Sequence, residues 1–293
     1  MSLLTDAQKR EFTRHGFLVV DDMLDEDDVT KARQRLRRDD MPHSWDELET
    51  MRSTPEDELP FDVEERNVKM SPGDFKITLY DDPFARLNEQ LYPYAEELVG
   101  EGRLNPPRET GRIVLRFPRK EAVNDPEAIQ TSQINSHVDG VNVGGSMPTF
   151  GAAVYLNRIQ PRGGGFTVWP GSHHLVGKYY REEADDIYGA DGGIPALSPD
   201  GTWEDDRQLS EQFDPIEVHG DPGTVVLWHG HMEHTGGINL SPGTVRMGLF
   251  TRFNLREDCY DDVMDYAKHP ISSWEGLRDV DLPPMPGYPD GGS

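Results

Sequence analysis

The sequence predicts a mainly β protein: a double-stranded β-helix, or jelly roll, with N-terminal helices packed outside the barrel. Helical periodicity is confined to residues 1–110, whereas residues 111–256 hold short runs of β-branched and aromatic residues separated by Gly and Pro. These runs follow one another at the spacing typical of β-sandwiches and barrels. The chain has no convincing internal repeat and no long linker, so we expect residues 1–293 to form a single domain.

Residues 1–110 are expected to supply helical support and loops on the substrate side of the barrel. The stretch TDAQKREFTRHG begins with the N-cap candidate Thr5 and ends at Gly16, as a short helix should. The run FLVV at residues 17–20 has the composition of a strand. Residues 25–39 place acids in the first turn of a helix and arginines in the last, which the helix dipole favours.

The next segment is less regular. Residues 41–75 are acidic, contain proline and show weak periodicity, which indicates loops or short helical turns. Residues 83–101 predict a longer helix, in which Pro93 is expected to cause a kink or a break. The apolar positions of this helix recur at helical spacing: Leu87, Leu91, Tyr94 and Leu98.

The barrel itself is expected to begin after residue 110. The predicted strands lie in the segments GRIVLRF, TFGAAVYL, GGFTVWP, FDPIEVHG, GTVVLWHG and VRMGLFTRFNL. Residues 179–212 interrupt this series and are too polar for a core, so we expect an insertion or lid over one mouth of the barrel. Residues 257–293 follow as a C-terminal extension.

Composition and charge limit the possible functions. Hydrophobic residues make up 35% of the chain, and its formal net charge of −25 repels nucleic acid and anionic membranes. No apolar run approaches the roughly 20 residues of a membrane span, and the N-terminus lacks the features of a secretory signal. The single cysteine, Cys259, excludes an intrachain disulfide and a cysteine-rich zinc module. We therefore expect a cytoplasmic enzyme.

Two separate stretches carry candidate metal ligands. In INSHVDGVN, His137 and Asp139 are two residues apart, so a strand would point both to one face. The later stretch LWHGHMEHTGGINLSPGTVR contains His229, His231 and His234. Two histidines and one carboxylate form the facial triad of non-heme Fe(II) oxygenases, which leaves three coordination positions open. A 2-oxo acid can fill two of these positions through its carboxylate and keto oxygens, and O2 the third.

An arginine indicates which histidine completes the triad. Arg246 follows His234 by twelve residues, so the next strand of a jelly roll would bring it back beside the metal. Its planar guanidinium suits the distal carboxylate of a C5 2-oxo diacid. This pairing favours His234, with His231 as the alternative. We expect His229 to serve packing, and the HH pair at residues 173–174 to be structural or solvent-facing.

Four segments, in this order, resemble the phytanoyl-CoA dioxygenase family of Fe(II)/2-oxoglutarate-dependent oxygenases: LTDAQKREFTRHGFLVVDDMLDEDDV, SHVDG, GGGFTVWPGSHH and HGDPGTVVLWHGHMEHTGGINLSPGTVR. Each segment alone is a weak signal, but four in the right order are a strong one. The resemblance implies that His137, Asp139 and His234 are the iron ligands and that Arg246 binds 2-oxoglutarate.

The sequence also departs from the family pattern. Ser136 and Val138 stand where members often have an aromatic residue and a glutamine. We expect Thr235 to replace a serine that helps to hold the 2-oxo acid, and Gln133 to take a polar role beside the cosubstrate. Halogenating relatives replace the metal-binding carboxylate with a small residue, so the presence of Asp139 favours oxygen transfer.

The function expected from these residues is hydroxylation of an unactivated C–H bond of a small-molecule metabolite, dependent on Fe(II), 2-oxoglutarate and O2, with release of succinate and CO2. One alternative is a cupin-like metal-dependent isomerase or dioxygenase that uses no 2-oxo acid. Another is a non-catalytic jelly-roll binding protein. Arg246 discriminates against the first alternative, which has no need of it, whereas the second predicts that Arg246→Ala and Asp139→Ala leave ligand binding intact. The acidic surface favours a small polar or zwitterionic substrate over an acyl-CoA.

Overall fold

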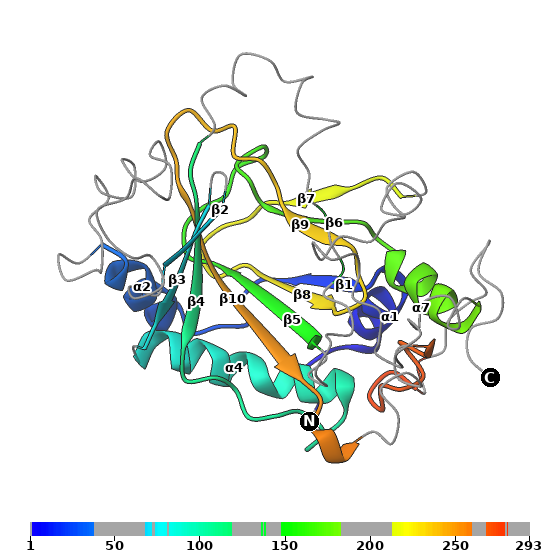
Figure 1. Cartoon of the computed structure of the whole chain (residues 1–293). Coiled ribbons are helices and arrows are strands. Elements are labelled where there is room, and N and C mark those ends of the chain that lie inside the picture. Colours follow the sequence, from blue (N-terminus) through cyan, green and yellow to red (C-terminus); the bar gives the residue numbers. More distant parts are fainter. Residues whose placement is uncertain are drawn as a thin grey trace.

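The computed structural model describes residues 2–37, 68–71, 74–80, 82–118, 136, 138, 148–182, 213–259, 268–278 and 280. Within this part of the chain, two antiparallel sheets form the body of the molecule (Figure 1). The larger sheet has the strand order β1 (Phe17–Val20), β8 (Val225–His229), β5 (Pro148–Tyr155), β10 (Arg246–Asn254), β4 (Gly111–Arg116), β3 (Asp74–Leu79) and β2 (Val68–Ser71). The smaller sheet has the order β7 (Ile216–Val218), β6 (Phe166–Val168) and β9 (His234–Gly236).

The alternation of side chains along β5 explains the layers. Ala152 and Val154 point to the helices and join the main hydrophobic core. Ala153 and Tyr155 point the other way, to a second apolar cluster that includes Trp228 and residues of the smaller sheet. Strand β5 is therefore buried on both faces. This arrangement is a jelly roll, as the sequence predicted, and all six predicted strand segments contain strands.

The described helices are α1 (Asp6–His15), α2 (Glu26–Arg35), α4 (Asp82–Val99) and α7 (Ser172–Glu182), with a 3-10 turn, η2 (Glu257–Cys259). The predicted ends of α1 are confirmed. Thr5 forms a capping box with Gln8, and Gly16 ends the helix in the left-handed region at φ 78°. In α2, the Asp25 side chain accepts a hydrogen bond from the backbone N–H of Asp28 at 3.1 Å. Helix α4 packs against β4, β5 and β10 on the side of the sheet away from β6 (Figure 1).

Of the two outcomes expected at Pro93, a kink or a break, the break is wrong, because α4 continues through this residue from 82 to 99, and the kink stays a prediction. A proline inside a helix costs about 3 kcal/mol. The buried side chains on both sides of it, Leu87, Leu91, Ala95 and Leu98, are all 0% exposed. Packing of this stripe against the sheet stabilises the helix enough to offset the lost backbone hydrogen bond.

The prediction of loops or helical turns for 41–75 is wrong for its last residues, where β2 and β3 form a hairpin on β4. Phe75, Ile77 and Leu79 alternate with polar residues and are buried in the core, which is the pattern of a half-buried strand. Helix α7 and strand β9 were not predicted either. The end of α7 takes up the start of the predicted lid at 179–212, and the rest of that segment lies outside the described residues.

Four histidines are packed together where α1, α7, β8 and the segment 268–278 meet. The ring centroids of His173 and His174 are 3.9 Å apart, those of His173 and His229 are 5.4 Å apart, and those of His229 and His231 are 5.1 Å apart. Both His173 and His174 place Nε2 within hydrogen-bond distance of the same backbone carbonyl, that of Thr13, at 3.1 and 2.9 Å. The HH pair is therefore structural.

Candidate active site

Of the three histidines at residues 229, 231 and 234, His229 serves packing. His229 is fully buried and stacks on Trp274 with ring centroids 4.6 Å apart. Its Nε2 lies 2.9 Å from the Pro270 carbonyl, and its Nδ1 accepts the backbone N–H of His231 at 2.9 Å. This is the packing role that we expected for His229. His231 is also buried, and burial lowers its pKa to about 4.

His234, the favoured ligand, lies in β9 opposite Val168 of β6. Its Nδ1 is 2.8 Å from the backbone carbonyl of Met232. A carbonyl only accepts, so Nδ1 carries the proton and Nε2 keeps a lone pair. Metal-binding histidines generally have such a hydrogen bond on the other ring nitrogen, which fixes the orientation and the tautomer.

Two residues of the SHVDG stretch are described, and one of them contacts the residue before His234. Ser136 is buried, and its Oγ donates a hydrogen bond to the carboxylate of Glu233, directly before His234, at 2.5 Å. Val138 is also buried. His137, Asp139 and Gln133 lie outside the described residues, so their roles stay predictions. Among the described residues, no three His, Cys, Asp or Glu side chains are grouped so that they could hold a metal ion.

An aromatic cluster joins His234 to Arg246. The His234 ring lies 5.2 Å from that of Phe166 and 5.3 Å from that of Trp228, measured between centroids. The Arg246 guanidinium carbon lies 5.2 Å from the centroid of Phe250, whose ring is 5.9 Å from Phe166. Arg246 is 1% exposed. The predicted histidine and arginine therefore flank one buried cluster, although they lie in different sheets.

Tyr155 lies close to the same cluster. Its hydroxyl donates to the Val218 carbonyl at 2.5 Å and accepts the Phe166 N–H at 2.9 Å, which ties β5 to the smaller sheet. Burial raises the pKa of Tyr155 to about 12, while the hydrogen bond from Phe166 and the charge of Arg246 act in the opposite direction. The hydroxyl is therefore neutral at physiological pH and is held in a fixed orientation.

The turn before β10 leads to Arg246 and is organised by Asn239, to which no role was assigned from the sequence. Asn239 is 0% exposed, and its Nδ2 donates to the carbonyls of Arg116 and Thr244 at 2.9 and 2.7 Å. Its Oδ1 accepts the backbone N–H and the hydroxyl of Ser241 at 2.9 and 2.6 Å. Asparagine before a Ser-Pro-Gly turn is the signal that could have revealed it.

Arg116 lies opposite Arg246 in the register of β4 and β10. Its guanidinium donates to the backbone carbonyls of Gly236 and Gly237, the latter at 2.5 Å, and so fastens β4 to the end of β9. A Cβ at position 236 would lie 2.6 Å from this guanidinium, so the missing side chain makes room for it. Thr235 pairs with Thr167, and alternation places its side chain on the face of β9 opposite His234. Its role beside the 2-oxo acid stays a prediction.

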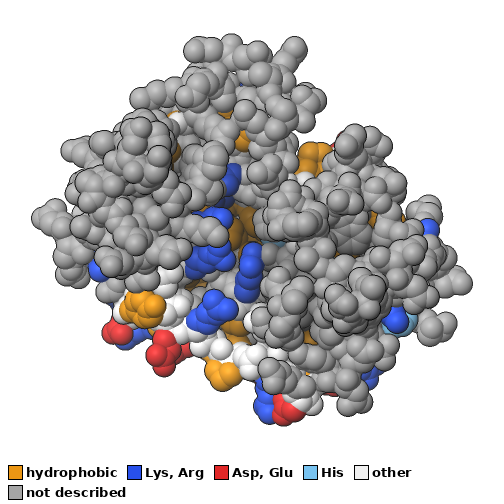
Figure 2. Space-filling view, viewed as in Figure 1, with side chains coloured by type: hydrophobic (Ala, Val, Ile, Leu, Met, Phe, Trp, Pro, Cys, Tyr) orange, Lys and Arg blue, Asp and Glu red, His pale blue; other side chains and the backbone are white. Residues whose placement is uncertain are grey.

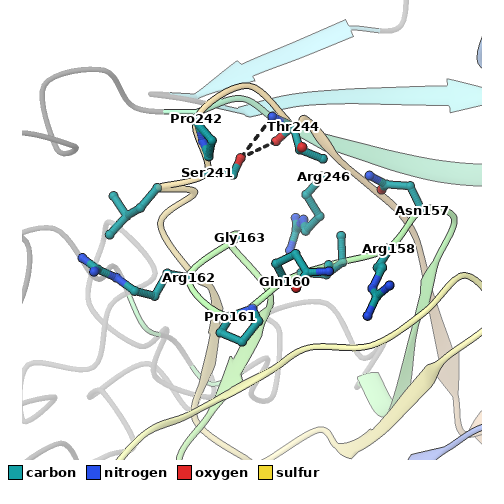
Figure 3. A pocket seen from close by; sticks show the side chains of 12 residues that line it. Asn157, Arg158, Gln160, Pro161, Arg162, Gly163, Ser241, Pro242, Thr244 and Arg246 are labelled. Atoms are coloured by element: carbon teal, nitrogen blue, oxygen red, sulfur yellow. Dashed lines mark hydrogen bonds between the residues drawn. The ribbon is translucent and has the colours of Figure 1, made fainter.

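A pocket of about 670 Å³ opens between the loop at 157–163 and the turn at 240–244. Figure 3 shows Arg246 extending between these loops, with Arg158 on one side and Arg162 on the other. The lining residues, all within the described chain, include three arginines and no acid. The pocket therefore favours an anionic ligand.

The positive charge extends along the inner face of the larger sheet. In β3, β4 and β10, every second residue points to the helices and belongs to the main hydrophobic core. The residues between them therefore point to the opposite face, the inner face of the jelly roll. These inward positions carry five basic residues: Lys76, Arg112, Arg116, Arg246 and Arg252. One acid, Asp74, has a register position on the same face. Figure 2 shows Lys and Arg side chains gathered in the middle of the view, on a chain whose net charge is −25.

The fold is shared with enzymes that use 2-oxoglutarate. The non-heme alpha-ketoglutarate-dependent carbocyclase SnoK from nogalamycin biosynthesis superposes with a TM-score of 0.52 at 15% identity, covering 86% of this chain and 84% of that one. The epimerase SnoN, solved with Fe3+, alpha-ketoglutarate and nogalamycin RO, gives 0.52 at 18% identity, covering 85% and 82%. The architecture is therefore that of the jelly-roll non-heme oxygenases.

Sequence comparison gives the family. Residues 12–248 match the phytanoyl-CoA dioxygenase family, and the chain belongs to it. The protein is accordingly an Fe(II)- and 2-oxoglutarate-dependent oxygenase that uses O2. No curated protein sequence matches the chain. None of the described helices is long and apolar enough to cross a membrane.

Proposed function

We propose that the protein hydroxylates an unactivated C–H bond of a small-molecule metabolite and releases succinate and CO2. The observation that carries this proposal is that His234 and Arg246, both buried, pack against one aromatic cluster. A metal ligand and a buried guanidinium that share such a cluster suit a 2-oxo diacid, which binds a metal at one end and an arginine at the other.

The donor set fits Fe(II). His234 has its Nδ1 proton occupied by the Met232 carbonyl, which leaves Nε2 to bind metal. In the proposed site His137 and Asp139 complete a facial triad. Fe(II) bound there would supply the activation of O2, with 2-oxoglutarate providing two electrons as it becomes succinate and CO2.

The residues of the chain contribute binding and orientation. Arg246 is proposed to bind the distal carboxylate of 2-oxoglutarate through paired N–H groups, which are strong when buried. The basic inner face attracts a dianion despite the acidic surface of the whole chain. Trp228 and Phe166 exclude water from one side of His234, which strengthens electrostatic interactions at the site.

The test is succinate release from 2-oxoglutarate by the Fe(II)-reconstituted protein in air, measured across a library of small metabolites. Arg246→Ala should raise the KM for 2-oxoglutarate at least about tenfold, because a charge-assisted hydrogen bond contributes about 1.5–3 kcal/mol. The matched control is Arg86→Ala, which removes an arginine of α4 that is 59% exposed and should leave this KM unchanged. Equal KM values for both variants, or no succinate with any metabolite, would contradict the proposal.

A further inference from the structure

Glu233 links three separate stretches of the chain at the candidate site. Its side chain is 0% exposed, and its Oε1 accepts the hydroxyl of Ser136 at 2.5 Å. Its backbone N–H donates to the hydroxyl of Ser172 at 2.9 Å. Its backbone carbonyl accepts the N–H of Trp169 at 3.1 Å. Glu233 therefore connects the SHVDG segment and the WPGS turn to the strand that begins at His234.

A buried carboxylate is expensive unless strong hydrogen bonds compensate for its desolvation. An apolar residue at this place would fill the same space without that cost, so packing alone does not explain a glutamate here. The position in sequence is informative, because Glu233 directly precedes one proposed iron ligand. Its partner Ser136 directly precedes another, His137. The bond therefore joins the two stretches that must hold a common metal.

We propose that Glu233 is a positioning residue for the metal site: its hydrogen bond to Ser136 holds the two ligand-bearing stretches together and so sets the affinity for the divalent ion. This inference rests on the proposed function. The two stretches are 97 residues apart in sequence, and this bond is a direct contact between them. Loss of such an outer hydrogen bond typically weakens metal binding about 10- to 100-fold.

The experiment measures Co(II) binding to the metal-free full-length protein through the visible absorption of the bound ion. Glu233→Ala and Ser136→Ala should each raise the Kd at least about tenfold. Because both substitutions remove the same bond, the double variant should bind no more weakly than the weaker single variant. Glu233→Gln keeps an acceptor oxygen for Ser136 and should stay within about threefold of the wild type.

Glu217→Ala is the matched control. This glutamate lies in β7 of the smaller sheet and accepts the backbone N–H groups of Arg162 and Gly165 at 2.7 and 2.8 Å, neither of which belongs to a ligand-bearing stretch. Glu217→Ala should leave the Kd for Co(II) unchanged. In urea, it should lower the free energy of unfolding of the metal-free protein by about as much as Glu233→Ala does.

The outcomes separate the two proposals. A wild-type affinity in Glu233→Ala, or a Glu233→Gln variant as weak as Glu233→Ala, overturns the positioning role and leaves the proposed function intact. Equal losses in Glu233→Ala and Glu217→Ala show a general stability effect and also overturn it. A wild-type protein that binds no Co(II) overturns both.

Discussion

The cluster of buried histidines should make the protein lose stability in mildly acidic solution. Burial lowers the pKa of His174 and of His231 from the ordinary 6.5 to about 4, and it lowers those of His173 and His229 well below their ordinary value. These rings are therefore neutral in the folded protein. In the unfolded chain they bind protons below pH 6.5, so acid favours unfolding.

The size of the effect follows from the two pKa values. A histidine with a pKa of 6.5 when unfolded and about 4 when folded loses about 1.4 kcal/mol of stabilisation between pH 8 and pH 5.5. His174 and His231 together therefore lower the free energy of unfolding by about 3 kcal/mol, and His173 and His229 add to this in the same direction. The free energy of unfolding therefore keeps its full value above about pH 6.5 and falls as the pH drops toward 4. A loss of this size is a large share of the stability of an ordinary domain.

Urea unfolding of the metal-free protein at pH 8, 6.5 and 5.5 and constant ionic strength measures the effect. His174→Gln removes a titrating ring but keeps an amide that can donate to the Thr13 carbonyl, so its loss between pH 8 and 5.5 should be smaller by about 1.4 kcal/mol. His219→Gln changes an exposed histidine and serves as the control. If His174→Gln shows the same pH dependence as the wild type, the reasoning from burial is refuted.

Two further predictions concern the geometry around the site. Asn239→Ala should lower the free energy of unfolding by about 2–3 kcal/mol in urea titrations, since the carbonyls of Arg116 and Thr244 lose a donor. It should also raise the KM for 2-oxoglutarate; an unchanged KM would show that the turn does not position Arg246. Gly151→Ala would place a Cβ 2.1 Å from the ring of Trp228, so we expect a loss of about 1–3 kcal/mol and an altered near-ultraviolet circular dichroism spectrum. An unchanged spectrum would mean that the ring accommodates the methyl group without moving.

Local signals in the sequence predicted the parts of the fold that depend on local chemistry. The capping box at Thr5 and the glycine at position 16 set the ends of α1 through contacts within a few residues. The path of α4 through Pro93 depends instead on packing against strands distant in the sequence. The hairpin of β2 and β3 was missed because weak periodicity across 41–75 obscured the alternation in its final strand.

In the candidate site, too, some residues can be predicted from local sequence and others only from contacts between distant parts of the chain. His234 and Arg246 could be selected because a metal ligand and a carboxylate-binding arginine have a recognisable spacing, and the structure brings both to one aromatic cluster. Glu233 could not be selected: it is one of 54 acids, and its place directly before His234 does not reveal that its side chain is buried against Ser136. Its importance arises from Ser136 and Ser172, which lie 97 and 61 residues away. Such contacts exist only after the chain has folded.

The pairing of β1 with β8 also has a consequence for biosynthesis. Phe17 lies opposite Trp228, and among the described strands of the larger sheet β1 pairs with β8 alone, so a strand made at the start of translation finds this neighbour about 200 residues later. At 5–20 residues per second, a ribosome needs about 10–40 s to make the intervening chain. During that interval the apolar FLVV strand has no edge of its own sheet to join. Nascent chains of this protein should therefore depend on holding chaperones, and arrested chains that end before β8 should be prone to aggregation.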